Sequence, residues 1–183
     1  MSGEMLVRHC SPTLAGIKTG NIFRTAYSSR DEMLASVRHW NALLGCKGLR
    51  FVPLQYDGKT ALIYAYRPSL LEQDICCGKA CDMLRMRGYC TSSCSRCIMK
   101  LIERIDEGGE IPHEIGLFLG YPAEDVHGFI ENKAENCKCV GCWKVYGDEA
   151  AAKARFERYK SCTEQYCRQF EQGQTLERLT VTV

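Results

Sequence analysis

Hydrophobic residues recur at helical spacing between residues 30 and 45, where the periodic pattern of the chain is clearest. Apolar positions three and four apart fall on one face of a helix and leave the other face polar. Gly45 ends the pattern, as glycine often does at a helix terminus. The spacing predicts an amphipathic helix over residues 30–45. Its apolar face consists of Met33, Leu34, Val37, Trp40 and Leu44.

Two strand-like runs follow, over residues 49–55 and 60–67, and together they contain Val, Ile and two Tyr. Residues of these types fit the half-buried surface of a sheet. The short segment between the runs includes Asp57-Gly58, and this dipeptide favours the tight turns that join antiparallel strands. The sequence therefore predicts a β-hairpin.

Residues 68–105 show a helical pattern in pieces, with breaks at Gly78 and Gly88. Ser92 or Ser93 can cap the last piece, because a serine side chain accepts hydrogen bonds from the free amides at a helix start. This part of the chain is therefore expected to be mainly helical.

The C-terminal third mixes short elements. Residues 115–119 are apolar without interruption, which is typical of a strand inside a sheet. A short helix is expected over 122–130, a loop over 132–141, a strand over 143–146 and a last helix capped by Asp148. The apolar side of that helix would contain Ala151, Phe156, Tyr159, Tyr166 and Phe170. The order of elements predicts an α+β fold, with helices packed on a small, mainly antiparallel sheet.

Composition describes an ordinary globular chain: 183 residues, 45% hydrophobic and 25% charged. This length suits one domain over residues 1–183. The net charge is only +2 and no long basic run occurs, so neither DNA nor RNA is an expected partner. We find no signal peptide and no stretch near the ~20 apolar residues that span a bilayer. A cytoplasmic protein without membrane contact is therefore expected.

The chain has thirteen cysteines, an odd number that argues against a complete disulfide framework. We expect most of them to be free thiols in a reducing cell. Because exposed thiols oxidise in air, such a load also suggests an anaerobic source.

Some of these cysteines have the short spacings of metal ligands. Zinc or an iron–sulfur cluster is one explanation, and ordinary packing or surface thiols is the other. The candidate ligands are Cys90, Cys94, Cys97, Cys137, Cys139 and Cys142, and Cys77 and Cys81 could add two more sulfurs. The regularly spaced Cys-x-x-Cys pairs of a zinc ribbon do not occur.

The competing hypothesis to a metal site is a set of catalytic residues. Cys10 precedes Ser11 and Pro12, which can cap and begin a helix, and the positive end of a helix lowers the pKa of a thiol. His113 lies at the mouth of the predicted strand 115–119 and could act as the base. Asp125 could orient its imidazole. Structural roles remain open: a buried thiol, a histidine in a polar pocket, and an acid that favours a helix start.

The donors of an oxyanion hole are harder to identify, because they must point at the place where charge develops. Backbone amides around Cys10 and the side chain of Asn21 are candidates.

Three runs, over residues 10–21, 113–130 and 143–148, resemble an uncharacterised family of small proteins from Clostridia and related anaerobes. The order of Cys10, His113 and Asp125 also resembles papain-like cysteine proteases and their acyl-transferring relatives. Among these are the amide-forming transglutaminases of polythioamide (closthioamide) antibiotic biosynthesis. The glutamine that papain-like enzymes place before their cysteine has no counterpart in residues 1–9.

The resemblance implies a papain-like fold and cysteine-dependent acyl transfer without a cofactor. Cys10 would attack a thioester or amide carbonyl, an amine or water would accept the acyl group, and His113 would move the proton. An acyl donor bound to a carrier protein and an amine acceptor are the implied partners. The alternatives are a cysteine peptidase or hydrolase, and a non-enzymatic cysteine-rich protein that handles metal or redox equivalents.

Overall fold

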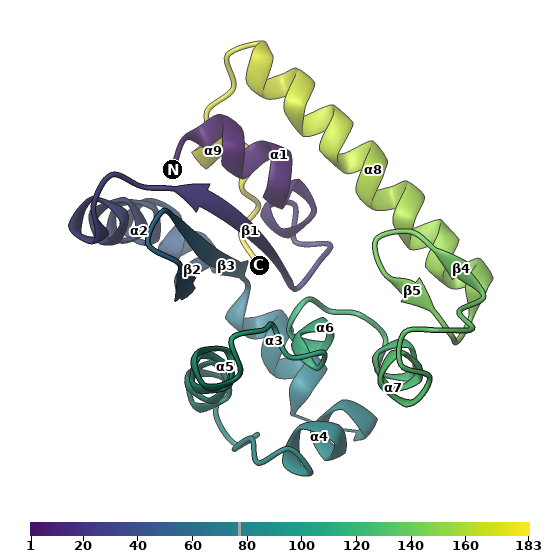
Figure 1. The fold of residues 1–183 in the computed structure, drawn as a ribbon. Helices are drawn as coiled ribbons and strands as arrows, with labels where there is room; N and C mark the ends of the chain where they lie inside the picture. Colours follow the sequence, from purple (N-terminus) through teal and green to yellow (C-terminus); the bar gives the residue numbers. More distant parts are fainter. Residues whose placement is uncertain (77) are drawn as a thin grey trace. The chain divides into compact units, whose positions relative to one another are not determined.

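The computed structural model describes residues 1–76 and 78–183, and these form two compact units (Figure 1). Unit 1 contains residues 1–70 and 161–183, and unit 2 contains residues 71–160. The sequence was expected to form one domain over residues 1–183. Each unit has its own internal contacts.

Unit 1 combines a three-stranded antiparallel sheet with helices. The strand order is β1-β3-β2, so the central strand is β3. The elements are α1 (Gly3–Leu14), β1 (Gly20–Ala26), α2 (Arg30–Leu44), η1 (Gly45–Lys47), β2 (Arg50–Tyr56), β3 (Thr60–Tyr66) and α9 (Leu176–Leu179).

The predicted hairpin and amphipathic helix are both confirmed. Asp57 fixes the turn between β2 and β3, since its Oδ1 accepts hydrogen bonds from the backbone amides of Lys59 and Thr60 at 3.1 and 2.6 Å. Gly58 has φ +86°, a conformation that suits glycine. Helix α2 begins after Ser29, whose hydroxyl accepts from the amide of Glu32 at 3.2 Å.

The predicted helix start at Ser11 is wrong. Helix α1 begins at Gly3, with Ser2 as its N-cap, so Pro12 lies near the C-terminal end of the helix. An apolar face that includes Leu6 and Val7 extends the helix upstream, and burial of this face outweighs the local capping signal. The hydroxyl of Ser11 instead donates a hydrogen bond to the carbonyl of Val7.

A fully buried arginine joins distant parts of unit 1. Arg67 donates to the carbonyl oxygens of Thr13, Leu14, Lys47 and Val181, at 2.6 to 2.9 Å. Burial lowers the pKa of its guanidinium. These bonds satisfy carbonyls at the end of α1, in η1 and near the C-terminus.

Unit 2 is mainly helical and has a second, two-stranded sheet. Its elements are α4 (Gly78–Arg85), α5 (Cys94–Gly108), α6 (Ile115–Phe118), α7 (Ala123–Glu131), β4 (Cys139–Val140) and β5 (Lys144–Val145). Helices α3 (Pro68–Ile75) and α8 (Glu149–Glu171) each cross the boundary between the units.

The strand predicted over residues 115–119 is wrong, because this segment contains the short helix α6. The amide of Leu119 donates to the carbonyl of Ile115 at 3.1 Å, and Gly120 then turns the chain with φ +74°. The segment is buried on all sides, and a short apolar run of this kind fits a buried helix as well as a buried strand.

The short helix and the last helix of the C-terminal third agree with the sequence. The strand predicted over 143–146 is only the two residues of β5, and the loop predicted over 132–141 contains strand β4, which pairs with β5. Asp148 caps α8, since its Oδ1 accepts from the amide of Ala151 at 3.0 Å. On α8, Tyr159 is buried as predicted, while Ala151 is exposed and its neighbour Ala152 is buried.

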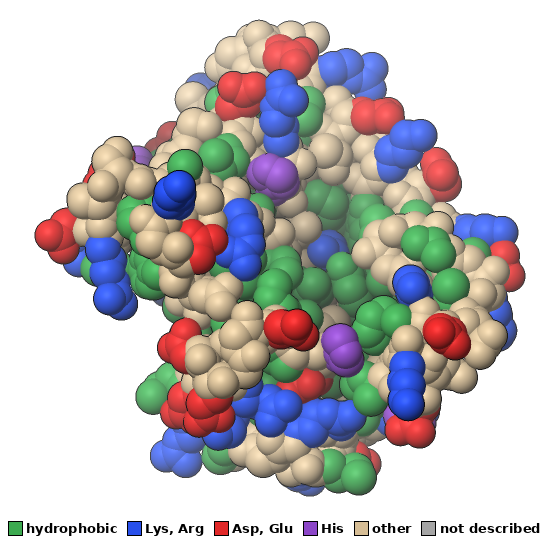
Figure 2. Space-filling view, viewed as in Figure 1, with side chains coloured by type: hydrophobic (Ala, Val, Ile, Leu, Met, Phe, Trp, Pro, Cys, Tyr) green, Lys and Arg blue, Asp and Glu red, His purple; other side chains and the backbone are tan. Residues whose placement is uncertain are grey.

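The helices and the two antiparallel sheets make this an α+β protein. In the described part of the chain, no helix has both the length and the apolar character needed to cross a membrane. Basic and acidic side chains are interspersed on the face in Figure 2, in keeping with the small net charge.

Candidate functional site

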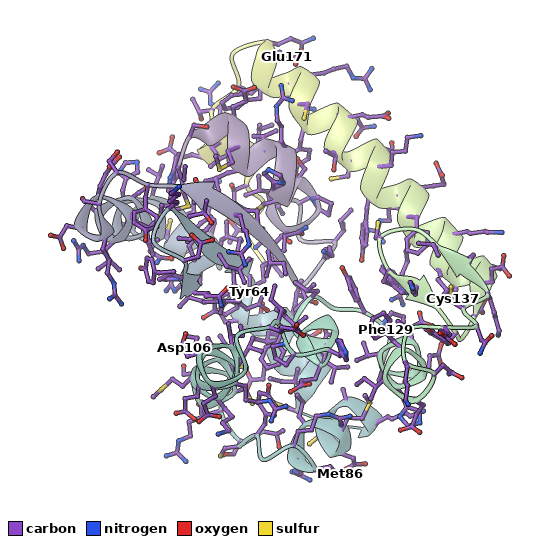
Figure 3. All side chains as sticks on the ribbon, in the orientation of Figure 1. Tyr64, Met86, Asp106, Phe129, Cys137 and Glu171 are labelled. Carbon is purple, nitrogen blue, oxygen red and sulfur yellow. The ribbon has the colours of Figure 1, made fainter. Side chains whose placement is uncertain are left out.

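A cavity of about 310 Å³ lies within unit 2. Residues before and within α6, residues of α7 and the β4–β5 hairpin form its wall, including Phe129, which Figure 3 labels on α7. Its polar side chains are His113, Asp125, Lys144 and Tyr121, whose hydroxyl donates to the carbonyl of Cys142 at 3.2 Å. The apolar ones include Ile111, Ile115, Val126, Phe129, Val140 and Trp143.

Asp125 holds two parts of this wall together. Its Oδ2 accepts a hydrogen bond from the indole Nε1 of Trp143 at 2.6 Å, and its Oδ1 accepts from the amides of Tyr146 and Gly147 at 2.7 Å each. The carboxylate is buried and both its oxygens are used. Among the described residues, no hydrogen bond joins Asp125 to His113. Asp125 therefore fixes α7 to the hairpin in this structure.

His113 stands at the edge of the cavity with an exposed side chain. Its ring contacts Phe129 edge-on, with centroids 5.1 Å apart and an angle of 73° between the rings. It precedes α6 rather than a strand. An exposed imidazole beside an apolar cavity can donate or accept a hydrogen bond at the polar end of a ligand.

Lys144 is the cationic group of the wall. Its Nζ donates to the carbonyl of Ala134 at 2.8 Å and lies 6.0 Å from the centre of the Phe129 ring. These contacts hold the ammonium near the cavity, and the ammonium has two further protons for other acceptors.

Glu114, the neighbour of His113, belongs to a buried ion cluster that sequence reasoning did not find. Its carboxylate lies 2.7 Å from Nε of Arg104 and 3.8 Å from Nε of Arg87, and it accepts a hydrogen bond from Tyr89 at 3.0 Å. Burial and the nearby carboxylate raise the pKa of Tyr89. The cluster anchors the start of α6, and so it supports the position of His113.

Cys10 lies in the hydrophobic core of unit 1, and its side chain has no exposed surface. Burial raises the pKa of the thiol to about 12, although Lys18 opposes the shift. Its place near the C-terminal end of α1 also removes the helix-start effect that the sequence suggested. The thiol is therefore neutral at physiological pH in this structure.

Asn21 lies in the same unit as Cys10, on β1. Its Oδ1 accepts a hydrogen bond from the hydroxyl of Thr13 at 2.8 Å, which ties the strand to the end of α1. Of the predicted catalytic residues, the structure brings His113 and Asp125 to one cavity in unit 2. Cys10 and Asn21 belong to unit 1.

The predicted metal ligands fall in two parts of unit 2. Cys90, Cys94 and Cys97 lie before and within the start of α5, whereas Cys137, Cys139 and Cys142 belong to the β4–β5 hairpin and its approach. In residues 1–76 and 78–183, no group of three His, Cys, Asp or Glu side chains is arranged to hold a metal ion. Cys77, also named as a possible ligand, lies outside the described residues.

The fold and the cavity together define an α+β protein with a candidate small-molecule site. Residues 6–180 match the family described as protein of unknown function (DUF3793), and the chain belongs to that family. No curated protein and no solved structure gives a significant match.

Proposed function

We propose that unit 2 binds a small molecule with a mainly apolar body and a polar end that carries a carbonyl or carboxylate group. The observation that carries this proposal is that residues from the runs 113–130 and 143–148 line one cavity. Its volume of about 310 Å³ lies at the lower end of the range for small-molecule sites, roughly 300–1,000 Å³.

The hydrogen-bonding groups of the cavity indicate that the polar end of the ligand carries acceptors. His113 and Lys144 can both donate hydrogen bonds, whereas the carboxylate of Asp125 is already occupied by three donors. A carbonyl or carboxylate would satisfy the two donors, and the apolar wall would bury the rest of the molecule.

Tryptophan fluorescence tests binding directly. The chain has two tryptophans, so Trp40→Phe leaves Trp143, in the cavity wall, as the single reporter. The probe is anilinonaphthalene sulfonate, an apolar anion. Saturable quenching of Trp143 with rising probe fluorescence is the expected result.

A matched set of variants separates the cavity from the general surface. Val140 is 68% exposed and lines the cavity, whereas Met99 is 61% exposed and lies on α5, outside the lining. Val140→Glu should weaken binding of the anionic probe about fivefold or more through charge repulsion, and Val140→Lys should not. Met99→Glu should leave binding unchanged. Equal affinities in all three variants would refute the proposal.

Cysteine-dependent acyl transfer is the second candidate function. The observation that favours it is the exposed imidazole of His113 beside a cavity of ligand size. In this hypothesis a papain-like arrangement uses Cys10 as the nucleophile and His113 as the base, and an amine or water accepts the acyl group. It requires the thiol of Cys10 to ionise, and burial opposes that ionisation.

Alkylation of the thiols tests this second candidate. Substoichiometric iodoacetamide is applied at several pH values to the wild type and to His113→Ala, and the labelled cysteines are located by peptide mass spectrometry. Preferential labelling of Cys10 near neutral pH, lost in the variant, would support an activated pair. Labelling of Cys10 that is slower than that of the exposed cysteines in both proteins would exclude it.

A further inference from the structure

Five cysteines of the described part of unit 2 gather around a short loop outside the cavity. The loop runs over residues 90–93 and leads into α5, and the cysteines come from the end of α3, from α4, from the loop and from the first turn of α5. They are Cys76, Cys81, Cys90, Cys94 and Cys97.

Hydrogen bonds connect three of these thiols to the loop. The thiol of Cys76 donates to the carbonyl of Thr91 at 3.5 Å, and that of Cys81 donates to the hydroxyl of Thr91 at 3.3 Å. The thiol of Cys97 donates to the carbonyl of Cys90 at 3.3 Å. Thr91 is itself buried, so the loop and the surrounding thiols form one packed structure.

Cys76 and Cys94 are neighbouring thiols of the cluster, since Cys76 binds the carbonyl of Thr91 and Cys94 begins α5 three residues further on. Burial and the neighbouring Cys76 raise the pKa of Cys94 to about 11, so Cys94 keeps its proton in this pair. Cys76 is exposed and Cys94 is half-buried. A small molecule can therefore reach Cys76, and Cys94 is the thiol next to it.

We propose that this cluster exchanges with a low-molecular-weight disulfide, which converts Cys76 and Cys94 from two thiols to one disulfide. The thiolate of Cys76 attacks one sulfur of the external disulfide and releases the first small thiolate. Cys94 then loses its proton to solvent and attacks the Cys76 sulfur, which releases the second. Two protein thiols lose two electrons and two protons in total, and the external disulfide becomes two thiols.

Cys90 is the rival site of attack in the same cluster. Its exposed sulfur lies 3.2 Å from the hydroxyl of Ser92 and 3.8 Å from a guanidinium nitrogen of Arg96, and these contacts lower its pKa. Exchange at Cys90 alone would give a mixed disulfide with the small molecule and no bond between two protein sulfurs. The test must therefore separate the two outcomes.

The experiment uses the reduced full-length protein and oxidised glutathione as the probe. After an acid quench the remaining thiols are alkylated, and tryptic peptides are mapped without reduction. Trypsin releases residues 60–79 with Cys76 and Cys77, and residues 88–96 with Cys90 and Cys94. Cys81 and Cys97 fall in separate peptides. The expected product is a link between the first two peptides, with two glutathione molecules released per link.

Single substitutions assign the bond. Cys76→Ser and Cys94→Ser should each abolish the link, whereas the matched variants Cys77→Ser and Cys90→Ser should keep it at the wild-type yield. Far-ultraviolet circular dichroism checks that all four variants remain folded. A link that persists in Cys76→Ser, a link that is lost in Cys90→Ser, or glutathione attached to Cys90 without any link would overturn the proposal.

Discussion

The carboxylate of Asp125 and the indole of Trp143 are joined by a hydrogen bond of 2.6 Å, and this bond connects α7 to the hairpin across the wall of the cavity. Two backbone amides, from Tyr146 and Gly147, bind the other oxygen. A single acidic side chain thus fixes three donors that lie 18 to 22 residues further along the chain.

Asp125→Ala should therefore destabilise unit 2, because it leaves buried donors without acceptors. We expect a loss of about 2–4 kcal/mol in the free energy of unfolding. Urea denaturation followed by the fluorescence of Trp143, in the Trp40→Phe background, measures it. The matched control is Glu124→Ala, an exposed acid in the same helical turn, which should change stability by less than about 0.5 kcal/mol. Equal stability of the two variants would contradict the role assigned to Asp125.

Arg67→Met tests the four carbonyl contacts in unit 1. The apolar side chain has a similar length but leaves the carbonyls of Thr13 and Leu14, among others, without their donor. The expected loss is about 3 kcal/mol or more, measured by urea denaturation followed by the fluorescence of Trp40, which lies in the same unit. Arg50→Met changes an exposed arginine and serves as the control. If both substitutions cost the same, the buried contacts do not stabilise the unit.

The buried thiol of Cys10 should make stability fall in alkaline solution. Its pKa rises from 9.0 to about 12 in the folded chain, so the unfolded chain loses this proton at a lower pH. The contribution is complete below pH 9 and is lost as the pH rises from 9 towards 12, by about 1.4 kcal/mol per pH unit. Urea denaturation at pH 8 and pH 10 of the wild type and of Cys10→Ala isolates this contribution from other titrating groups. The wild type should lose more stability than the variant over this interval, and parallel losses would contradict the burial of the thiol.

Glu114→Gln should destabilise unit 2, because Arg104 and Arg87 would keep their positive charges without the neighbouring carboxylate. We expect a loss of about 3 kcal/mol, near the lower end for a broken buried pair, because both arginines are partly exposed. Tyr89→Phe removes only the hydrogen bond to Glu114 and should cost about 1 kcal/mol. Thermal unfolding of the two variants shows which substitution costs more stability. A larger loss of stability for Tyr89→Phe than for Glu114→Gln would contradict this interpretation.

Local signals predicted the elements that local interactions stabilise. The Asp57-Gly58 turn, the cap at Asp148 and the apolar face of α2 are all set by residues close together in the sequence, and each occurs as expected. Residues 115–119 were misassigned because burial on all sides depends on distant packing. The Ser11-Pro12 signal failed for the same reason, since upstream apolar residues extend α1.

The candidate site could be predicted only in part. The sequence singled out His113, Asp125 and the run 143–148, and the structure brings them together around one cavity. The partner of Asp125 could not be inferred, because the indole of Trp143 comes from a separate hairpin. The contact of Cys76 with Thr91 likewise joins the end of α3 to the loop before α5, and the spacing of the cysteines gives no sign of it.

Arg67 also bears on the order in which the chain can fold during synthesis. Its acceptors at Thr13, Leu14 and Lys47 leave the ribosome before or with it, but Val181 emerges more than a hundred residues later. Unit 2, made of residues 71–160, is complete by then. The hydrogen bond from Arg67 to Val181 must therefore wait for the end of the chain, while the inserted unit already has all of its own residues available to fold.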